Sequence, residues 1–336
     1  MKAIVQDTYG SPDVLELRDI DKPVVGDDDV LVRVHAAGVD PGVWHLMTGL
    51  PYLVRLMGYG LRKPKTRVRG VDVAGRVEAV GENVTQFQPG DEVFGTCDGS
   101  FAEYACARED KVTAKLADLT FEQAAAVPIS ACTALQGLRD KGKVQAGHKI
   151  LIIGTAGGVG TFAVQLAKAF GAEVTGVCST TKVDLVRSIG ADHVIDYTRD
   201  DFAQAGQRYD LILDTAGNRS LSHLRRALTP RGTLVIVGGE GGGRWLGGFQ
   251  RGIFWAPLLS LFVGQKLRPL VSKERKEDLE FLKELIEVGK VTPVIDRTYP
   301  LSEVPEAIRY LEEGHARGKV VITVPVGDAP VTQAAG

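Results

Sequence analysis

The chain has 336 residues, which is long enough for two domains that each bury a hydrophobic core. It carries 40 Lys and Arg against 42 Asp and Glu, and the net charge of −2 argues against a nucleic-acid partner, because a phosphate backbone binds a basic face. The longest apolar run, 252–264, is interrupted by Pro257 and is too short to cross a bilayer, so no transmembrane segment is expected.

The first 120 or so residues have the pattern of short strands separated by turns. Alternating or β-branched apolar residues occupy 29–39 and 70–84, a Pro-Gly turn opens 88–95, and 100–107 continues the pattern. We therefore expect an all-β module here, built as a small, partly open barrel.

From about Phe121 the pattern changes to alternating helices and strands. An Ala-rich helix is expected over 120–138, with Thr120 as its N-cap. Apolar strands separated by amphipathic helices then follow, which is typical of a parallel sheet covered on both faces. The expected strands are 148–154, 173–179, 193–197, 209–217 and 232–239, and the expected helices include 158–170 and 182–189. The strand at 232–239 is the last parallel strand of this prediction.

The C-terminal part of the chain returns to a mixed pattern. A strongly amphipathic helix is expected over 273–291, followed by a strand at 294–301, another helix and a final strand at 319–324. The tail 327–336 is predicted to be disordered.

Three glycines punctuate the turn that follows the first strand of the parallel sheet. Gly154, Gly157 and Gly160 suit a dinucleotide site, since glycine allows a tight turn, a close approach of pyrophosphate and close packing of helix on strand. The following helix N-terminus supplies N–H groups and partial positive charge for the phosphates. Thr155 occupies the place of the first glycine in the strict GxGxxG spacing, but the strand–turn–helix–strand context still predicts dinucleotide binding.

The end of the second strand indicates which dinucleotide binds. An NAD-specific site carries Asp or Glu here, whereas this strand ends in Ser179, Thr180, Thr181 and Lys182, with no acid before Asp184. Hydroxyls and a lysine suit a 2′-phosphate through charge-assisted hydrogen bonds, so the sequence favours NADP(H) over NAD(H). Taken alone, the lysine is equally consistent with an ordinary surface residue at a helix start.

At this point the motifs match a known family. The chain resembles the medium-chain dehydrogenase/reductase superfamily, in its zinc-free quinone oxidoreductase-like branch, which includes zeta-crystallin-like proteins. The resemblance covers nearly the whole chain and rests on "MKAIVQDTYGSPDVLEL", "GVDVAGRVEAVG", "QPGDEVFG", "GSFAEYA" and "HARGKVVITV". It implies an α/β fold: a GroES-like β-barrel catalytic domain from residues 1–122 and 290–336, a doubly wound Rossmann domain from 123–289, and NADP(H) in the cleft between them.

The resemblance also implies which residues hold the cofactor. The pyrophosphate would lie on Thr155, Ala156, Gly157, Gly158, Val159 and Gly160, the 2′-phosphate on Ser179 and Lys182, the adenosine ribose near Tyr197, the nicotinamide near Thr133, and the tail motif with Arg317 and Lys319 would approach the cofactor. Packing at a strand end remains open for the tyrosine, a surface salt bridge for the arginine, and helix capping or packing for the threonine.

The positions of zinc ligands in related alcohol dehydrogenases carry other residues here. Those enzymes use a Cys after a "GV" turn and a His-Glu pair in "GHE"; this chain has Asp40 at the first position and "GVD", with Val71 for the imidazole, at the second. Catalytic zinc needs three protein ligands, and no cluster of four cysteines follows Gly95 to form a structural zinc lobe. We therefore expect no metal, and we expect His35 and His45 to be buried or interfacial.

Without a zinc Lewis acid, hydride donation to a quinone or to the β-carbon of an α,β-unsaturated carbonyl is easier than alcohol oxidation. Tyr52 stands where related reductases carry a tyrosine beside the substrate, which makes it the predicted donor to a developing enolate oxygen; an aromatic wall is the alternative. Asp40 replaces an asparagine common in the branch and is the predicted proton donor.

The segment 242–271 combines large apolar residues with flanking basic ones. Three interpretations remain open: a lid over a bulky apolar substrate, a homodimer surface, or a segment at 245–264 that contacts a membrane surface. Its apolar residues are Trp245, Phe249, Phe254, Trp255, Leu258 and Phe262, and its basic residues are Arg244, Arg251, Lys266 and Arg268.

The leading hypothesis is an NADPH-dependent reductase of an apolar quinone or enone. The alternatives are a non-catalytic NADPH-binding protein, crystallin-like or regulatory, and a zinc-free alcohol dehydrogenase. Four scattered cysteines without a CxxC pair, and an N-terminus without an apolar signal region, predict a reduced, cytoplasmic protein, and we expect a homodimer.

Overall fold

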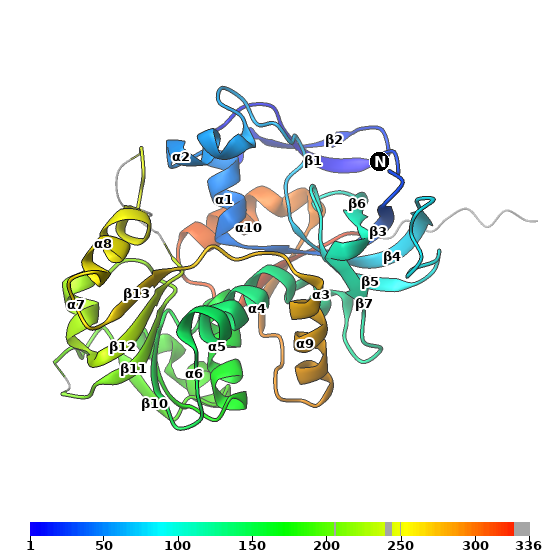
Figure 1. Ribbon diagram of the computed structural model, residues 1–336. Coiled ribbons are helices and arrows are strands. Elements are labelled where there is room, and N and C mark those ends of the chain that lie inside the picture. Colours follow the sequence, from blue (N-terminus) through cyan, green and yellow to red (C-terminus); the bar gives the residue numbers. More distant parts are fainter. Residues whose placement is uncertain (205, 239–243, 249, 326–336) are drawn as a thin grey trace, which may run out of the picture.

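The computed structural model describes residues 1–204, 206–238, 244–248 and 250–325, with the side chains of Arg251 and Ile253 also outside this description. The predicted tail at 327–336 and Phe249 therefore lie outside the described residues. Two large sheets lie beside each other, one parallel and one mainly antiparallel (Figure 1). The predicted α/β fold class is confirmed.

The mainly antiparallel sheet joins both ends of the chain. Its seven strands run in the order β14-β15-β3-β4-β5-β7, with β6 paired to β3, and β1 and β2 form a separate ribbon. Antiparallel pairing of β15 with β3, which sets Val320 opposite Val39, places the C-terminal segment in the N-terminal sheet. The predicted boundaries at 122 and 290 stay a prediction. The strands are β1 (Lys2–Gln6), β2 (Leu15–Asp19), β3 (Asp29–Val39), β4 (Asp72–Val80), β5 (Glu92–Thr96), β6 (Tyr104–Arg108), β7 (Val112–Ala114), β14 (Ile295–Pro300) and β15 (Lys319–Thr323).

The second sheet is parallel throughout and has six strands in the order β10-β9-β8-β11-β12-β13. In chain order this is the 3-2-1-4-5-6 arrangement of a doubly wound dinucleotide fold, in which the winding reverses between β8 and β11. The strands are β8 (Lys149–Ile153), β9 (Glu173–Cys178), β10 (His193–Asp196), β11 (Tyr209–Asp214), β12 (Leu228–Ile236) and β13 (Lys266–Pro269).

The sixth strand, β13, corrects one prediction. The strand predicted at 232–239 corresponds to β12 and is not the last parallel strand, because β12 pairs in parallel with β13 inside the segment 242–271. The sequence "KLRP" hides this strand: it is a four-residue edge strand in which only Leu267 is buried, so it lacks the apolar run of an inner strand.

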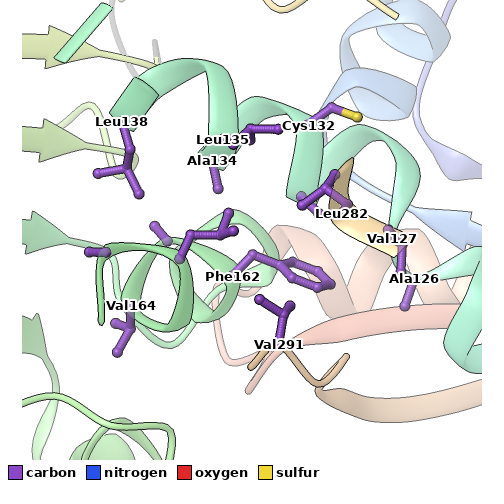
Figure 2. Packing of buried hydrophobic residues seen from close by; sticks show 14 of the residues in the cluster. Ala126, Val127, Cys132, Ala134, Leu135, Leu138, Phe162, Val164, Leu282 and Val291 are labelled. Atoms are coloured by element: carbon purple, nitrogen blue, oxygen red, sulfur yellow. The ribbon is translucent and has the colours of Figure 1, made fainter. Parts of the chain in front are cut away.

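Alternate side chains of the parallel strands enter two separate cores. Ile150 and Ile152 of β8 pack with α4 and α5 on one face, whereas Leu151 and Ile153 pack on the other face. Figure 2 shows Phe162 of α5 enclosed by the first core. These faces are covered by α5 (Gly158–Ala169), α6 (Val183–Ser188), α7 (Leu221–Arg226) and α8 (Ala256–Ser260), with α4 (Pro128–Leu135) beside α5.

The helix predicted over 120–138 is broken into three parts. Thr120 caps α3 (Phe121–Ala125) as expected, in a capping box with Gln123, but Pro128 starts a new helix, α4, and a wider π-helical turn follows over Gln136–Gly142. The short α3 packs on β3 and β4, whereas α4 packs on α5. The break therefore carries the chain from one sheet to the other.

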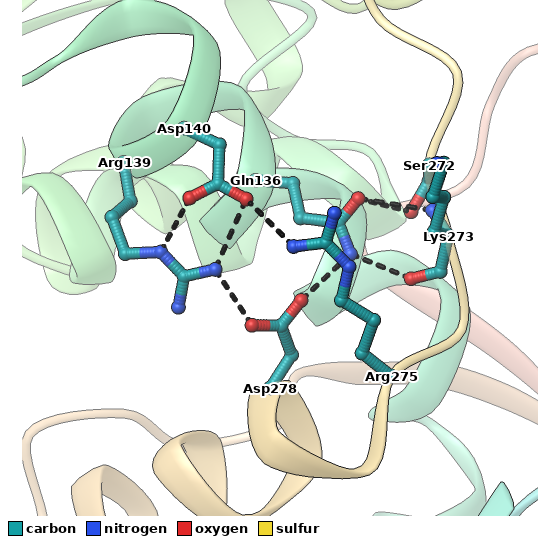
Figure 3. A network of polar contacts seen from close by, with 7 residues as sticks. All are labelled: Gln136, Arg139, Asp140, Ser272, Lys273, Arg275 and Asp278. Atoms are coloured by element: carbon teal, nitrogen blue, oxygen red, sulfur yellow. Dashed lines mark hydrogen bonds and ion pairs between the residues drawn. The ribbon is translucent and has the colours of Figure 1, made fainter.

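A helix was predicted over 273–291, and the structure has α9 at Lys276–Glu287. This helix forms hydrogen bonds to both parts of the molecule. Its buried Asp278 accepts hydrogen bonds from Gln136 at 2.8 Å and from Arg139 at 2.7 Å (Figure 3). On the other side, the hydroxyl of Thr113 in β7 donates to Glu280. These bonds hold the two sheets in a fixed relation around the cleft.

Candidate active site

A cleft of about 280 Å³ lies where the carboxyl ends of β8, β9 and β11 face the other sheet. In doubly wound sheets a ligand binds at this edge, where the strand order reverses. Residues from α1 (Pro41–Thr48) and from the segment before β15 complete the wall. The predicted site residues that line the cleft are Asp40, Ala156, Gly157, Gly158, Val159, Gly160, Ser179, Lys182, Tyr197 and Lys319.

The glycine turn is built as the sequence predicts. Gly154 has φ +84°, a left-handed conformation that suits glycine, and a Cβ there would lie 2.5 Å from the Thr215 hydroxyl oxygen. A Cβ on Gly160 would lie 2.2 Å from the carbonyl oxygen of Gly154, so only glycine lets the first turn of α5 pack on the loop. The N-cap of α5 is Gly157, which has no side chain to cap the helix. The helix N-terminus is therefore open to the cleft.

Two alanine substitutions in this turn are expected to have different effects. Gly160→Ala should destabilise the fold, because its Cβ meets backbone. Gly157→Ala should leave the melting temperature of the free protein unchanged, since its Cβ has one contact, 3.5 Å from the carbonyl oxygen of Gly154, and otherwise enters the cleft. The second variant is expected to bind NADPH at least about tenfold more weakly, measured by calorimetric titration. Equal melting temperatures for the two variants would contradict this account.

Four predicted site residues do not line this cleft, and two of them, Thr155 and Thr133, are buried. The hydroxyl of Thr155 is buried and donates to the carbonyl oxygen of Val177 at 2.8 Å, so its side chain joins the turn to β9. Thr133 is buried within α4, consistent with the helix-packing alternative. Their predicted contacts with the cofactor stay predictions.

One end of the cleft gathers cationic and aromatic side chains. The Lys182 ammonium donates to the carbonyl oxygens of Gly314 at 3.1 Å and Ala316 at 2.9 Å, which leaves one of its three N–H donors for a ligand. Burial lowers the pKa of Lys182. Tyr197 is half-exposed and lies 5.9 Å from the Arg219 guanidinium, which also lines the cleft. This end can hold a phosphate on two cations.

The tail motif, predicted to approach the cofactor, reaches the cleft beside the glycine turn. Arg317 is exposed, its backbone N–H donates to Asp296 at 2.9 Å, and its side chain is not part of this cleft wall. Its neighbours Ala316 and Gly318 do line the cleft, and Gly318 forms a parallel bridge with Gly157 of the glycine turn. The motif therefore approaches the turn through its backbone.

The other end of the cleft contains a buried ion pair. Lys319, predicted as a cofactor residue, lines the cleft, but its ammonium lies 2.9 Å from Asp72, and both side chains are at most 1% exposed. Asp72 also accepts a hydrogen bond from the backbone N–H of Ile129 at 2.9 Å. Complete burial raises the pKa of Asp72, Asp40 adds to the rise, and Lys319 opposes it.

Asp40 stands beside this ion pair at the start of α1. One carboxylate oxygen caps the helix by accepting from the N–H of Gly42 at 2.7 Å, while the other, Oδ2, is buried without a hydrogen-bond partner among the described residues. Asp40 itself is part of the cleft wall.

Tyr52 lies apart from these residues. It begins the short helix α2 (Tyr52–Val54), its ring packs edge-on against Trp245 with centroids 5.4 Å apart, and it does not line this cleft. The predicted hydroxyl donor and its aromatic-wall alternative therefore both stay predictions.

The two histidines near the zinc-ligand positions have structural contacts. His35 stacks on Phe121 with centroids 4.1 Å apart, and a ring nitrogen of His45 lies 2.8 Å from the carbonyl oxygen of Leu50. Burial lowers the pKa of both imidazoles. Within the described part of the chain, no group of three or more His, Cys, Asp and Glu side chains is arranged to hold a metal ion.

The structure adds residues that the sequence did not point to. The turn after β11 enters the cleft beside the glycine turn, and Asp214 shapes it by accepting from the N–H of Gly217 at 3.0 Å. The signal was present, since "DTAGNR" follows a buried strand whose carboxyl end lies next to β8. For Asp72, an acid inside the apolar stretch "GVDVAG" implied a buried partner. The added residues are Ser130, Asp72, Thr215, Asn218 and Arg219.

These residues fit a phosphorylated dinucleotide. The glycine turn leaves room that a Cβ on Gly157 would fill, and the uncapped helix N-terminus suits a pyrophosphate. Lys182 and Arg219, which both line the cleft, suit a further anionic group.

Comparisons with known families cover both sheets. The family model described as alcohol dehydrogenase GroES-like domain matches residues 26–118, and the model described as zinc-binding dehydrogenase matches residues 189–322.

Individual proteins are similar over nearly the whole chain. The NAD(P)H oxidoreductase RTN4IP1, mitochondrial, of Mus musculus is 35% identical over 96% of this chain and 89% of that protein. The 2-methylene-furan-3-one reductase of Solanum lycopersicum is 34% identical over 96% of this chain and 79% of that protein. The solved structure of the quinone oxidoreductase from Coxiella burnetii matches with a TM-score of 0.83 and 30% identity, covering 97% of this chain and 99% of that chain.

Proposed function

Because the chain belongs to the medium-chain dehydrogenase/reductase superfamily, in its zinc-free quinone oxidoreductase-like branch, we propose that it is an NADPH-dependent reductase of quinones or α,β-unsaturated carbonyl compounds. It is an oxidoreductase that uses a nicotinamide cofactor. The preference for the phosphorylated cofactor, the acceptor class and zinc independence are the parts proposed here.

The main support for the proposal is the identity and the contacts of the residues at the zinc-ligand positions. Asp40 caps α1, Val71 offers no ligand atom, and Asp72 is bonded to Lys319 and to the backbone of Ile129. A site without a Lewis acid favours acceptors that are already activated toward hydride. For the cofactor, the support is the pair Lys182 and Arg219 at the end where a 2′-phosphate would lie.

The protein's own residues would bind the cofactor, orient it and the substrate, and supply a proton. When bound, NADPH supplies the hydride that adds to the β-carbon of an enone or to a quinone. The glycine turn and Lys182 would hold the dinucleotide, and the Asp72–Lys319 pair fixes the wall beside it. Asp40, which lines the same cleft, would supply the proton that the α-carbon takes up after hydride transfer.

Two alternatives remain testable beside this proposal. A non-catalytic NADPH-binding protein would bind the cofactor equally well and turn nothing over. A zinc-free alcohol dehydrogenase would need a general base in place of the metal and would act on a saturated aldehyde in the reducing direction. The homodimer also stays a prediction, which a mass measurement in solution tests.

The proposal is tested by following the loss of NADPH and NADH absorbance with a phenanthrenequinone, a benzoquinone, an alkenal, a cyclic enone and a saturated aldehyde. We expect turnover of quinones or enones with NADPH, weaker turnover with NADH, and none of the saturated aldehyde. Asp40→Asn keeps the helix cap and is expected to lower the rate of enone turnover while leaving the melting temperature and NADPH binding unchanged.

The Gly157→Ala variant serves as the background control, since it should fold but bind NADPH weakly. If the protein turned over nothing while NADPH raised its melting temperature, the reductase would be ruled out in favour of a binding protein.

A further inference from the structure

Two segments on one side of the molecule expose large apolar side chains. Fifteen large hydrophobic side chains are exposed in the described part of the chain, and ten of them fall within 56–61 and 245–262. We call the exposed side chains of the described residues within 52–66, 244–248 and 254–266 together the apolar-basic surface. The ten are Leu56, Met57, Tyr59, Leu61, Trp245, Phe254, Trp255, Leu258, Leu261 and Phe262.

The two segments meet at residues 52–53 and 244–245. The backbone N–H of Tyr52 donates to the carbonyl oxygen of Arg244 at 2.7 Å, and that of Leu53 donates to Trp245 at 3.2 Å. The ring of Tyr52 packs against that of Trp245. Figure 1 shows α2 and α8, which belong to the two segments, on the same side of the molecule.

Side-chain hydrogen bonds to backbone carbonyl oxygens stabilise the first segment, which exposes apolar residues to solvent. The guanidinium of Arg55 folds inward and donates to the carbonyl oxygens of Thr48 and Gly49. The hydroxyl of Tyr9 donates to the carbonyl oxygens of Tyr59 at 2.9 Å and Gly60 at 2.7 Å. Leu56 is 68% exposed, and these hydrogen bonds stabilise the turn that carries it.

The charge of these segments is opposite to that of the remaining protein. Residues 52–66 contain four Lys and Arg and no acid, and residues 244–266 contain three and no acid. The chain as a whole has 40 basic and 42 acidic residues, which leaves 33 basic against 42 acidic residues outside the two segments. A chain that is nearly neutral overall is thus strongly polarised.

The cations around the apolar side chains are available to a partner. Arg62, Lys63, Lys65, Arg244 and Lys266 are exposed, and none of them forms an ion pair with a described residue. Exposed Trp, Phe and Leu surrounded by unpaired Lys and Arg are the composition of surfaces that lie in the interface of an anionic bilayer.

We infer that the apolar-basic surface docks on a membrane that contains anionic lipids. The apolar side chains would enter the boundary between headgroups and acyl chains, where Trp is favoured, and the cations would contact lipid phosphates. No described helix is long and apolar enough to span a bilayer, so the contact lies on the surface.

The inference is tested by flotation of the full chain with phosphatidylcholine vesicles, with and without phosphatidylglycerol. We expect binding to the anionic vesicles and little to the neutral ones, with loss at high salt. Lys63→Glu is expected to weaken binding at least about fivefold, because a basic residue near an anionic surface contributes about 1 kcal/mol. The double variant Leu261→Ser/Phe262→Ser is expected to abolish flotation.

Matched controls separate this surface from general effects. Lys290→Glu and the double variant Val24→Ser/Val288→Ser change exposed residues elsewhere and should bind like the unaltered protein. Failure to float with anionic vesicles would overturn the inference, as would equal effects in the controls. If Leu261→Ser/Phe262→Ser instead converted a dimer to a monomer in light scattering without any vesicle binding, the surface would be a dimer interface.

Discussion

Replacing Lys319 by methionine is expected to lower the free energy of unfolding by about 3–5 kcal/mol near pH 8, measured by urea denaturation. Lys319 and Asp72 are at most 1% exposed and 2.9 Å apart, so the variant leaves a carboxylate buried without its cation. That cost exceeds what the ion pair itself contributes, because an unpaired charge retains the full penalty of removal from water.

The pH dependence of this variant follows from the pKa of Asp72, which burial raises in the folded protein. A carboxyl group with a raised pKa holds its proton more tightly when folded, so its contribution to stability is present at low pH and is lost as pH rises through the folded pKa. Removing Lys319 takes away an interaction that lowers this pKa. The destabilisation should therefore be smaller at about pH 5 than at about pH 8.

An exposed ion pair provides the control for Lys319→Met. Lys168 lies 2.8 Å from Asp192, but both side chains are about one third exposed, so Lys168→Met should cost about 1 kcal/mol or less. Replacing both buried partners, as in Asp72→Leu with Lys319→Met, should recover part of the lost stability. A loss in Lys319→Met that matches the control, or that does not change with pH, would contradict this account.

Replacing Lys182 by alanine is expected to raise the KM for NADPH by about tenfold to one hundredfold while the KM for NADH changes little. A hydrogen bond to a charged group contributes about 1.5–3 kcal/mol, and 1.4 kcal/mol corresponds to a factor of ten. Lys182 lines the cleft with one N–H donor not used by Gly314 and Ala316, and NADH lacks the phosphate that this donor would contact.

The neighbouring helix provides the control for Lys182→Ala. Arg187 is exposed on α6, pairs with Asp184 and does not line the cleft, so Arg187→Ala should leave both KM values unchanged. An equal rise for NADPH and NADH in Lys182→Ala would show instead that the lysine acts by holding the carbonyls of Gly314 and Ala316 in place.

Local patterns were sufficient for most elements of the fold. The Thr120 cap, the glycine turn at 154–160 and the strands of the parallel sheet from β8 to β12 are specified by near neighbours in the chain. The exceptions are informative: Pro128 breaks a long apolar helix, and β13 lacks an apolar run because it is an edge strand.

The site was predicted where it depends on backbone shape and missed where it depends on distant partners. Gly157 and Lys182 were predicted because a turn and a strand end fix their places. Asp72 and Arg219 were missed because their roles come from elements separated by many residues.

By itself, the sequence determined the two kinds of sheet and the glycine turn, because hydrophobic periodicity and glycine spacing act over a few residues. Its motifs, through their resemblance to known proteins, pointed to the family. Only the tertiary structure decided which partner each of several charged and aromatic side chains contacts. Lys319 turns to Asp72 because β15 returns to pair with β3, and Tyr52 joins Trp245 because two loops meet, although almost 200 residues separate them. Burial and partner choice are properties of the assembled chain, since they depend on which side chains folding brings together.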